Sequence, residues 1–195
     1  FIELHHSYWG NINSNKVADH ITYPDVCAWL GALWFAQSAG DDVLYGRLVD
    51  KFDLLFTTES HLQPKMNPSV SNKVDYYVFG SIPLEIYKTR KDDKYRQLGM
   101  KYADGQWTLP ANASKIEKDW HNKGYSWQTR LWIDDMFMIT ALQAQAYHVT
   151  GDEKYRERTA SEMVLYLDKI QRDNGLFYHA PTAPFYWARG MAGWL

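Results

Sequence analysis

The sequence predicts an all-α protein built from helical hairpins, arranged as part of an α/α barrel. Apolar residues recur at helical spacing along most of the chain, and no region is rich in strand signals. A short acidic turn recurs three times, and each time a more apolar helix precedes it and an amphipathic helix follows. The turns and the tyrosines that follow them are Asp41 and Tyr45, Asp92 and Tyr95, and Asp152 and Tyr155. Because these turns lie about 50 to 60 residues apart, a period that indicates solenoids or toroids, we expect about three pairs of inner and outer helices.

The first pair is expected near the N-terminus. Residues 1–19 are polar and aromatic without a clear period, which predicts an extended or loop segment. Pro24 suits the first turn of a helix, and we expect a strongly apolar helix over residues 26–39. Gly40 suits the position just after a helix, where the backbone is often left-handed. An amphipathic helix is then expected over residues 43–57.

The second pair follows a loop. Residues 61–72 are rich in Pro, Asn and Ser and predict a long loop. Residues 73–90 are apolar at helical spacing, but Pro83 falls inside them. Either the helix kinks at that proline or a new helix starts with Ser81 near its cap. A short amphipathic helix is expected over residues 92–104.

The third pair contains the central helix of the chain. Residues 107–128 carry many helix breakers and predict irregular structure. Residues 130–147 are apolar almost all the way round, which is typical of a buried helix. An amphipathic helix is expected over residues 153–172, and then an aromatic-rich loop over residues 175–195, with a possible helix start near Arg189.

The aromatic content bears on function. Aromatic residues make up 16% of the chain, and the 9 Trp and 14 Tyr exceed what a core needs. Such rings present a flat apolar face with a polar group at one edge, which suits stacking against sugars. A large interface or an aromatic-rich core explains the surplus equally well. The net charge of -2 provides no basic patch for nucleic acid.

Several classes of site lack their motifs. No uncharged run approaches transmembrane length, and no spacing of His, Cys or acidic residues matches a metal site. Phosphate-binding, dinucleotide-binding and serine-hydrolase motifs are also missing, so we expect no cofactor. Cys27 is the single cysteine, and its apolar surroundings predict a buried thiol without an internal disulfide. The compartment stays open between periplasmic or secreted and cytoplasmic.

Two adjacent carboxylates, Asp134 and Asp135, lie near the start of the central helix. A buried carboxylate is usually paired, protonated or part of a functional site. In the structural interpretation, Arg130 pairs with Asp134 four residues later, and Asp135 caps or pairs elsewhere. In the functional interpretation, an apolar pocket raises the pKa of one carboxyl until it can donate a proton near neutral pH.

Asp75 is the second candidate, because it also opens an apolar helix. The helix dipole alone can favour an acidic residue there. In a barrel, however, Asp75 and Asp134 at matching ends of inner helices would face one cavity. Paired carboxylates are the usual equipment for glycoside hydrolysis, and each can tune the pKa of the other by repulsion.

A third group of candidates lies near the C-terminus, between Gly175 and Trp194. An arginine beside aromatic rings suits a carboxylate on a ring-shaped ligand. A packed aromatic loop, with its arginine paired to a surface acid, is the alternative. The candidates are His179, Trp187, Arg189 and Trp194.

These motifs together resemble the unsaturated rhamnogalacturonyl hydrolases of glycoside hydrolase family 105, and less closely the unsaturated glucuronyl hydrolases of family 88. The resemblance runs from about Tyr23 to Trp194. It implies a six-hairpin (α/α)6 barrel, or toroid, that is incomplete in this chain. We therefore expect residues 1–195 to form a single domain, the N-terminal portion of the barrel. The motifs that carry the resemblance are VDYYVFGSIPLEIY, RLWIDDMFM, TGDEKYRERTASEMVLYL, GLFYHA and YWARG.

The resemblance also implies an activity without metal or organic cofactor. Such enzymes remove a 4,5-unsaturated uronic acid from the non-reducing end of oligosaccharides that a polysaccharide lyase has produced, such as fragments of pectic rhamnogalacturonan. An aspartate protonates C4 of the double bond and activates water for attack at C5. The hemiketal then opens and the glycosidic bond breaks. A non-catalytic carbohydrate-binding toroid, or an inactive fragment, is the alternative function.

The family pattern assigns roles to residues of this chain. Asp134 matches the proton donor, and Asp75 matches the second active-site aspartate. The segment between His179 and Trp187 is short for the family, and the spacing after Arg189 differs by one residue. The sugar beyond the uronate is therefore left open. The residues that match substrate-binding positions are Tyr23, His121, His179, Trp187, Arg189 and Trp194.

Overall fold

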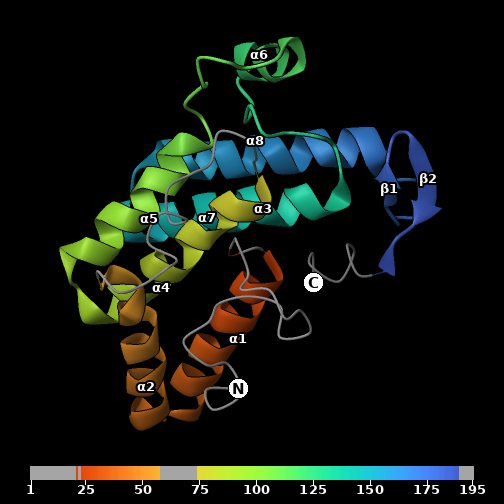
Figure 1. The fold of residues 1–195 in the computed structure, drawn as a ribbon. Helices are drawn as coiled ribbons and strands as arrows, with labels where there is room; N and C mark the ends of the chain where they lie inside the picture. The colour runs from red at the N-terminus through yellow and green to blue at the C-terminus, as the bar shows by residue number, and fades with distance from the viewer. Residues whose placement is uncertain (1–20, 22, 58–73, 189–195) are drawn as a thin grey trace, which may run out of the picture.

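The computed structural model describes residue 21, residues 23–57 and residues 74–188, and this part is helical apart from one small hairpin (Figure 1). The expected loops at residues 1–19 and 61–72 lie outside the described residues. Two 3-10 helices, Leu54–Phe56 and Val78–Gly80, follow α2 and join α3 to α4. The other elements are α1 (Tyr23–Ala39), α2 (Asp42–Asp53), α3 (Val74–Tyr77), α4 (Ser81–Arg90), α5 (Asp93–Gly105), α6 (Lys115–Asn122), α7 (Ile133–Thr150), α8 (Glu153–Ile170), β1 (Tyr178–Ala180) and β2 (Ala183–Tyr186).

The three expected helical pairs are present, which confirms the all-α class. α1 packs against α2, α4 against α5, and α7 against α8. α4 also contacts both α1 and α7, so that the three apolar helices form an inner layer. Figure 1 shows α7 and α8 running alongside each other, with the β-hairpin at the end where α7 begins and α8 finishes.

The same turn chemistry links the helices of each pair. A residue with a left-handed backbone ends each inner helix, and the next residue is an aspartate whose side chain accepts a hydrogen bond from a backbone N–H of the following helix. This arrangement satisfies amide groups that the helix itself leaves unpaired. The left-handed residues are Gly40, Lys91 and Gly151, and the capping residues are Asp41, Asp92 and Asp152.

The tyrosines of the repeat join neighbouring pairs to each other. The hydroxyl of Tyr95 on α5 donates to Asp53 Oδ1 on α2 at 2.6 Å. The hydroxyl of Tyr155 on α8 donates to Asp104 Oδ1 on α5 at 2.8 Å. Each acceptor lies in the last turn of its helix. The outer helices are therefore tied together in sequence, α2 to α5 to α8.

The central helix begins later than the sequence predicts, at Ile133 instead of Arg130. Leu131 interrupts it, because its φ of 61° is left-handed, a conformation that costs a non-glycine residue about 1–2 kcal/mol. Pro83 lies in the first turn of α4, so the second of the two alternatives for that segment is correct. The remaining inner and outer helices start and end within a few residues of their predicted bounds.

One prediction for the less regular segments is wrong, and another needs an addition. Residues 107–128 contain α6, which begins with a capping box between Ser114 and Glu117. The predicted loop after Gly175 contains an antiparallel hairpin, in which Tyr178 lies opposite Tyr186. Short strands with mixed burial leave little alternation in the sequence, which is why the hairpin was not apparent.

Cys27 is exposed, so the prediction of a buried thiol is also wrong. It lies on a side of α1 that no described helix covers.

Among the described helices, none is both long enough and apolar enough to cross a membrane.

A small second core lies beneath the first turn of α7. It joins α7, α8 and the β-hairpin, and it is separate from the main core of the helical pairs. Its buried members are Ile133, Met136, Leu165, Tyr166, Ile170 and Phe177.

The tyrosine–aspartate links are expected to stabilise the helical layer. Tyr155→Phe should lower the free energy of unfolding by about 1–2 kcal/mol, because a hydrogen bond to a charged acceptor is lost. Urea denaturation monitored by circular dichroism measures this change. Tyr45→Phe is the matched control in the first pair, since within the described residues the Tyr45 hydroxyl makes no bond to an aspartate. Equal destabilisation by both substitutions would contradict a role for the link.

Candidate active site

An arginine bridge connects two carboxylates at the start of α7. The Arg130 guanidinium donates to Asp135 from Nε, at 3.1 Å to each carboxylate oxygen, and from Nη2, at 2.5 Å to Oδ1. Its third nitrogen, Nη1, lies 3.1 Å from Asp75 Oδ2 on α3. Arg130 therefore fixes an aspartate of α3 beside the first turn of α7. The guanidinium group carries several N–H donors in a fixed planar fork, so it can bind two carboxylates at once. A lysine ammonium is a single point charge without this geometry.

The two acids of the bridge differ in their surroundings. Asp135 is fully buried, whereas the Asp75 side chain is 29% exposed. Burial raises the pKa of Asp135 to about 6; hydrogen bonds and charge from Arg130 oppose that rise, and repulsion by Asp75 adds to it. Asp135 thus serves as the internal anchor of Arg130, and Asp75 lies at the accessible end.

Asp134 lies half-buried beside this bridge. The structural interpretation that paired Arg130 with Asp134 is wrong, because Arg130 turns to Asp135 instead. Successive helical residues point about 100° apart, so only one of the two adjacent acids can face Arg130. Within the described residues, Asp134 makes no hydrogen bond or ion pair. Its carboxyl therefore has no described partner at the N-terminal end of α7, the end that Asp75 of α3 contacts through Arg130.

The β-hairpin brings aromatic side chains to the same end of α7. The His179 ring on β1 packs edge-on against Trp132, with 5.4 Å between ring centroids, and against Trp187, at 4.8 Å. Among the residues that the structure describes, none forms a hydrogen bond with the buried Nδ1 of His179. The structure therefore places His179 and Trp187 near Trp132, the residue that precedes α7.

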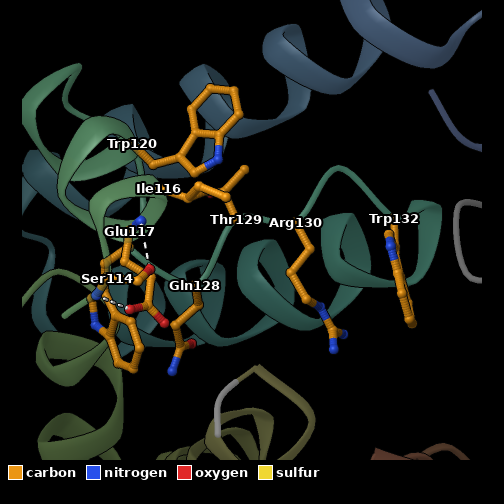
Figure 2. Close-up of a pocket in the computed structure, with 9 residues that line it drawn as sticks. Ser114, Ile116, Glu117, Trp120, Gln128, Thr129, Arg130 and Trp132 are labelled. Carbon is orange, nitrogen blue, oxygen red and sulfur yellow. Dashed lines mark hydrogen bonds between the residues drawn. The ribbon is translucent and has the colours of Figure 1, made fainter. Parts of the chain in front are cut away.

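A pocket of about 380 Å³ opens next to the arginine bridge, between α6 and residues 127–132. This volume lies in the range of small-molecule sites. Figure 2 shows Arg130 and Trp132 projecting side by side from that segment, with Ile116 and Trp120 of α6 farther along the pocket. The Arg130 guanidinium also lies over the Trp132 ring, 4.5 Å from its centroid. An apolar wall with a few polar groups suits a sugar better than a purely apolar ligand.

Behind this pocket, Glu162 of α8 is completely buried. Its Oε1 accepts a hydrogen bond from the Ser126 backbone N–H at 2.6 Å, and the Thr129 hydroxyl donates to both of its oxygens at 3.1 and 3.2 Å. Burial raises the pKa of Glu162 to about 7; these hydrogen bonds oppose the rise, and the charge of Asp135 adds to it. Glu162 therefore holds the segment that leads into Arg130.

The remaining predicted site residues are less well connected. Tyr23 is the first residue of α1 and packs against the main core. His121 on α6 lies 3.2 Å from the backbone oxygen of Trp107 through Nε2, and it is not part of the pocket. Arg189 and Trp194 lie outside the described residues.

Sequence reasoning missed the roles of Arg130 as a bridge and of Trp132 as the contact of His179. Both residues belong to the motif RLWIDD, which the resemblance already marked.

Among the described residues, no group of three or more His, Cys, Asp or Glu side chains lies close enough to hold a metal ion.

The family to which a protein with this arrangement belongs follows from its sequence. A sequence model described as Glycosyl Hydrolase Family 88 matches residues 3–195, almost the whole chain. The chain belongs to glycosyl hydrolase family 88. The assignment to unsaturated uronyl hydrolases as a group is thereby supported, whereas the narrower resemblance to family 105 is a proposal. No curated protein and no solved structure matches the chain.

The buried acid Glu162 predicts a pH dependence of stability in this family 88 chain. Its pKa is about 4.5 in an unfolded chain and about 7 in the folded protein, so the folded state binds more protons between these values. Its contribution to stability is therefore fully present below about pH 4.5 and is lost as the pH rises through about 7.

Glu162→Gln should remove this dependence, because an amide does not titrate. The free energy of unfolding of the unmodified protein should fall more steeply between pH 4.5 and 8 than that of the variant, by at most about 1.4 kcal/mol per pH unit. Urea denaturation at several pH values measures both slopes. Equal slopes would show that the Glu162 pKa is not raised.

Proposed function

We propose that this family 88 glycoside hydrolase removes a 4,5-unsaturated galacturonyl group from the non-reducing end of lyase-generated oligosaccharides such as rhamnogalacturonan fragments. The observation that carries the proposal is the ion pair between Arg130 and Asp75. It brings a second carboxylate to the start of α7, the end of the helix that also carries Asp134. Two acids at one end of the inner layer are the equipment that proton transfer to a sugar needs.

In the proposed mechanism the double bond is hydrated. Asp134 in its acid form gives its proton to C4, and positive charge develops at C5. Water then attacks C5 and returns a proton to Asp134, so that one water molecule is added and the acid is regenerated. The resulting hemiketal at C5 opens, and the glycosidic bond breaks. These steps are proton transfers and additions that require neither a metal ion nor an organic cofactor.

Other residues have binding roles in this proposal. Asp75 orients the reacting groups and its negative charge stabilises the cationic transition state, an electrostatic effect that is strong in a partly dry site. His179 and Arg189 hold the uronate, and Trp187 stacks on the sugar ring. Tyr23, His121 and Trp194 are further proposed contacts, although the first two lack a described link to the bridge.

The nine-residue pocket beside Arg130 supports an oligosaccharide substrate. It begins at Trp132, which contacts His179, and extends to Trp120 of α6. A uronate held near His179 would therefore have its glycosidic bond within reach of an aromatic surface. Stacking of this kind tolerates different sugars, so the identity of the next sugar must come from experiment.

Asp134→Asn is expected to abolish turnover. The amide cannot donate the proton to carbon, so the rate should fall at least about 1,000-fold, within the range found for removal of a general acid. The measurement is the loss of ultraviolet absorbance from the conjugated enol acid of an unsaturated rhamnogalacturonan disaccharide.

Asp50→Asn is the matched control, because Asp50 is an exposed aspartate on α2, a helix that contributes no residue to the site. It should leave the rate within about twofold of the unmodified protein, as surface substitutions usually do. Full activity in Asp134→Asn would remove Asp134 from the catalytic role. Binding of the disaccharide by the unmodified protein without any absorbance loss would favour a carbohydrate-binding toroid.

Substrate comparison tests the galacturonyl assignment. The unsaturated galacturonyl–rhamnose disaccharide should have a kcat/KM at least about tenfold higher than an unsaturated glucuronyl–hexosamine disaccharide, a difference of about 1.4 kcal/mol in the transition state. Both reactions are followed by the same absorbance loss. The reverse preference would place the chain with the glucuronyl hydrolases and leave hydration itself intact.

A further inference from the structure

Glu162 lies outside the proposed reaction, although its burial and its hydrogen bonds connect it closely to the site. It comes from α8 and binds Thr129, which lines the pocket, although Glu162 is not itself a lining residue. An ionised carboxylate without exposure to water is costly unless its oxygens accept hydrogen bonds. All the hydrogen bonds that the structure gives to Glu162 come from two residues of this segment, Ser126 and Thr129.

The segment that Glu162 holds has few other anchors. The Ser126 hydroxyl donates to the backbone oxygen of Gln106 at 2.8 Å, and the Trp127 indole donates to the backbone oxygen of Gly105 at 2.8 Å. Both of these bonds fix the beginning of the segment. Thr129, at its end, has Glu162 as its side-chain partner, and the next residue is Arg130.

The backbone beyond Arg130 is strained, and the strain lies between two anchors. Leu131 has a φ of 61°, which a leucine adopts only when its neighbours hold it there. On one side, Glu162 fixes Thr129. On the other side, Asp135 binds the Arg130 side chain from within α7. Without the Thr129 anchor, Leu131 could return to an unstrained backbone, and Arg130 would shift away from Asp75.

We propose that Glu162 is a positioning residue of the active site, which holds Ser126 and Thr129 so that Arg130 keeps Asp75 at the start of α7. This inference rests on the proposed function in one respect, namely that Asp75 serves the reaction. It assigns to a buried residue of α8 a task in a site built by α3 and α7.

The charges around Glu162 agree with this role. Asp135 of α7 repels it, and the Tyr166 hydroxyl on α8 lies close enough to be affected by its charge. Asp135 already occupies two nitrogens of Arg130, so Glu162 does not bind the arginine directly. It acts on Arg130 through the backbone and contributes hydrogen bonds instead of an ion pair.

Three substitutions test the role. Thr129→Val keeps the side-chain shape and removes the hydroxyl, and Glu162→Ala removes the acceptor. Glu162→Gln keeps an acceptor oxygen for the Ser126 N–H. We expect kcat to fall about 10- to 100-fold in Thr129→Val and Glu162→Ala, while KM changes less than about threefold, because misplaced catalytic groups reduce the rate at unchanged binding. Glu162→Gln should restore most of kcat.

A double-mutant cycle separates positioning from simple stabilisation. In an Arg130→Met background, Thr129→Val should reduce kcat by less than about twofold, since the residue through which it acts is already gone. Thr129→Val is used here because it is the variant least expected to impair folding. Glu157→Ala, an exposed glutamate on α8, is the control and should change neither kcat nor KM.

Two results overturn the inference. One is an unchanged kcat in Thr129→Val and Glu162→Ala proteins that are folded by circular dichroism. The other is an equal loss of kcat by Thr129→Val in the presence and absence of Arg130. Failure of the proposed function would look different, because the unmodified protein would then consume none of the unsaturated disaccharide.

Discussion

The bond network around Arg130 is the constraint on which the rest of the site depends. Asp135 is fully buried, and its charge is tolerable there only because Arg130 donates three hydrogen-bond contacts to it. The remaining nitrogen of Arg130 then reaches Asp75, which ties α3 to the first turn of α7. Loss of the arginine would leave a buried carboxylate uncompensated and Asp75 unanchored. Stability and site geometry therefore rest on the same side chain.

The helical layer supplies the fixed frame for this network. Capped acidic turns close each pair of helices, and tyrosine–aspartate bonds join the outer helices to one another. Because α4 packs between α1 and α7 and α3 also contacts α7, Asp75 of α3 lies at the end of the layer where α7 begins. The second core and the β-hairpin complete that end and bring His179 against Trp132. Side chains from distant parts of the sequence thus meet at this end of the layer.

The repeat of acidic turns was enough to predict the paired helices, because capping chemistry is local and leaves a readable signature at Asp41, Asp92 and Asp152. The apolar character of residues 130–147 also identified a buried helix with two acids at its start. It could not decide between Asp134 and Asp135 as partner of Arg130, since a helix that is apolar all round has no marked face. That choice depends on the left-handed backbone of Leu131, which no residue preference predicts. The hairpin and α6 are too short for periodicity to detect.

A time course that follows two products together tests the central claim, hydration of the double bond at the start of α7, most directly. The absorbance of the unsaturated uronate and the release of the neighbouring sugar are measured in the same reaction of the unmodified protein. Hydration requires that absorbance is lost before the glycosidic bond breaks, so release should never precede the loss. Release of the sugar while the absorbance persists would show direct cleavage at the anomeric carbon and contradict the proposed role of Asp134.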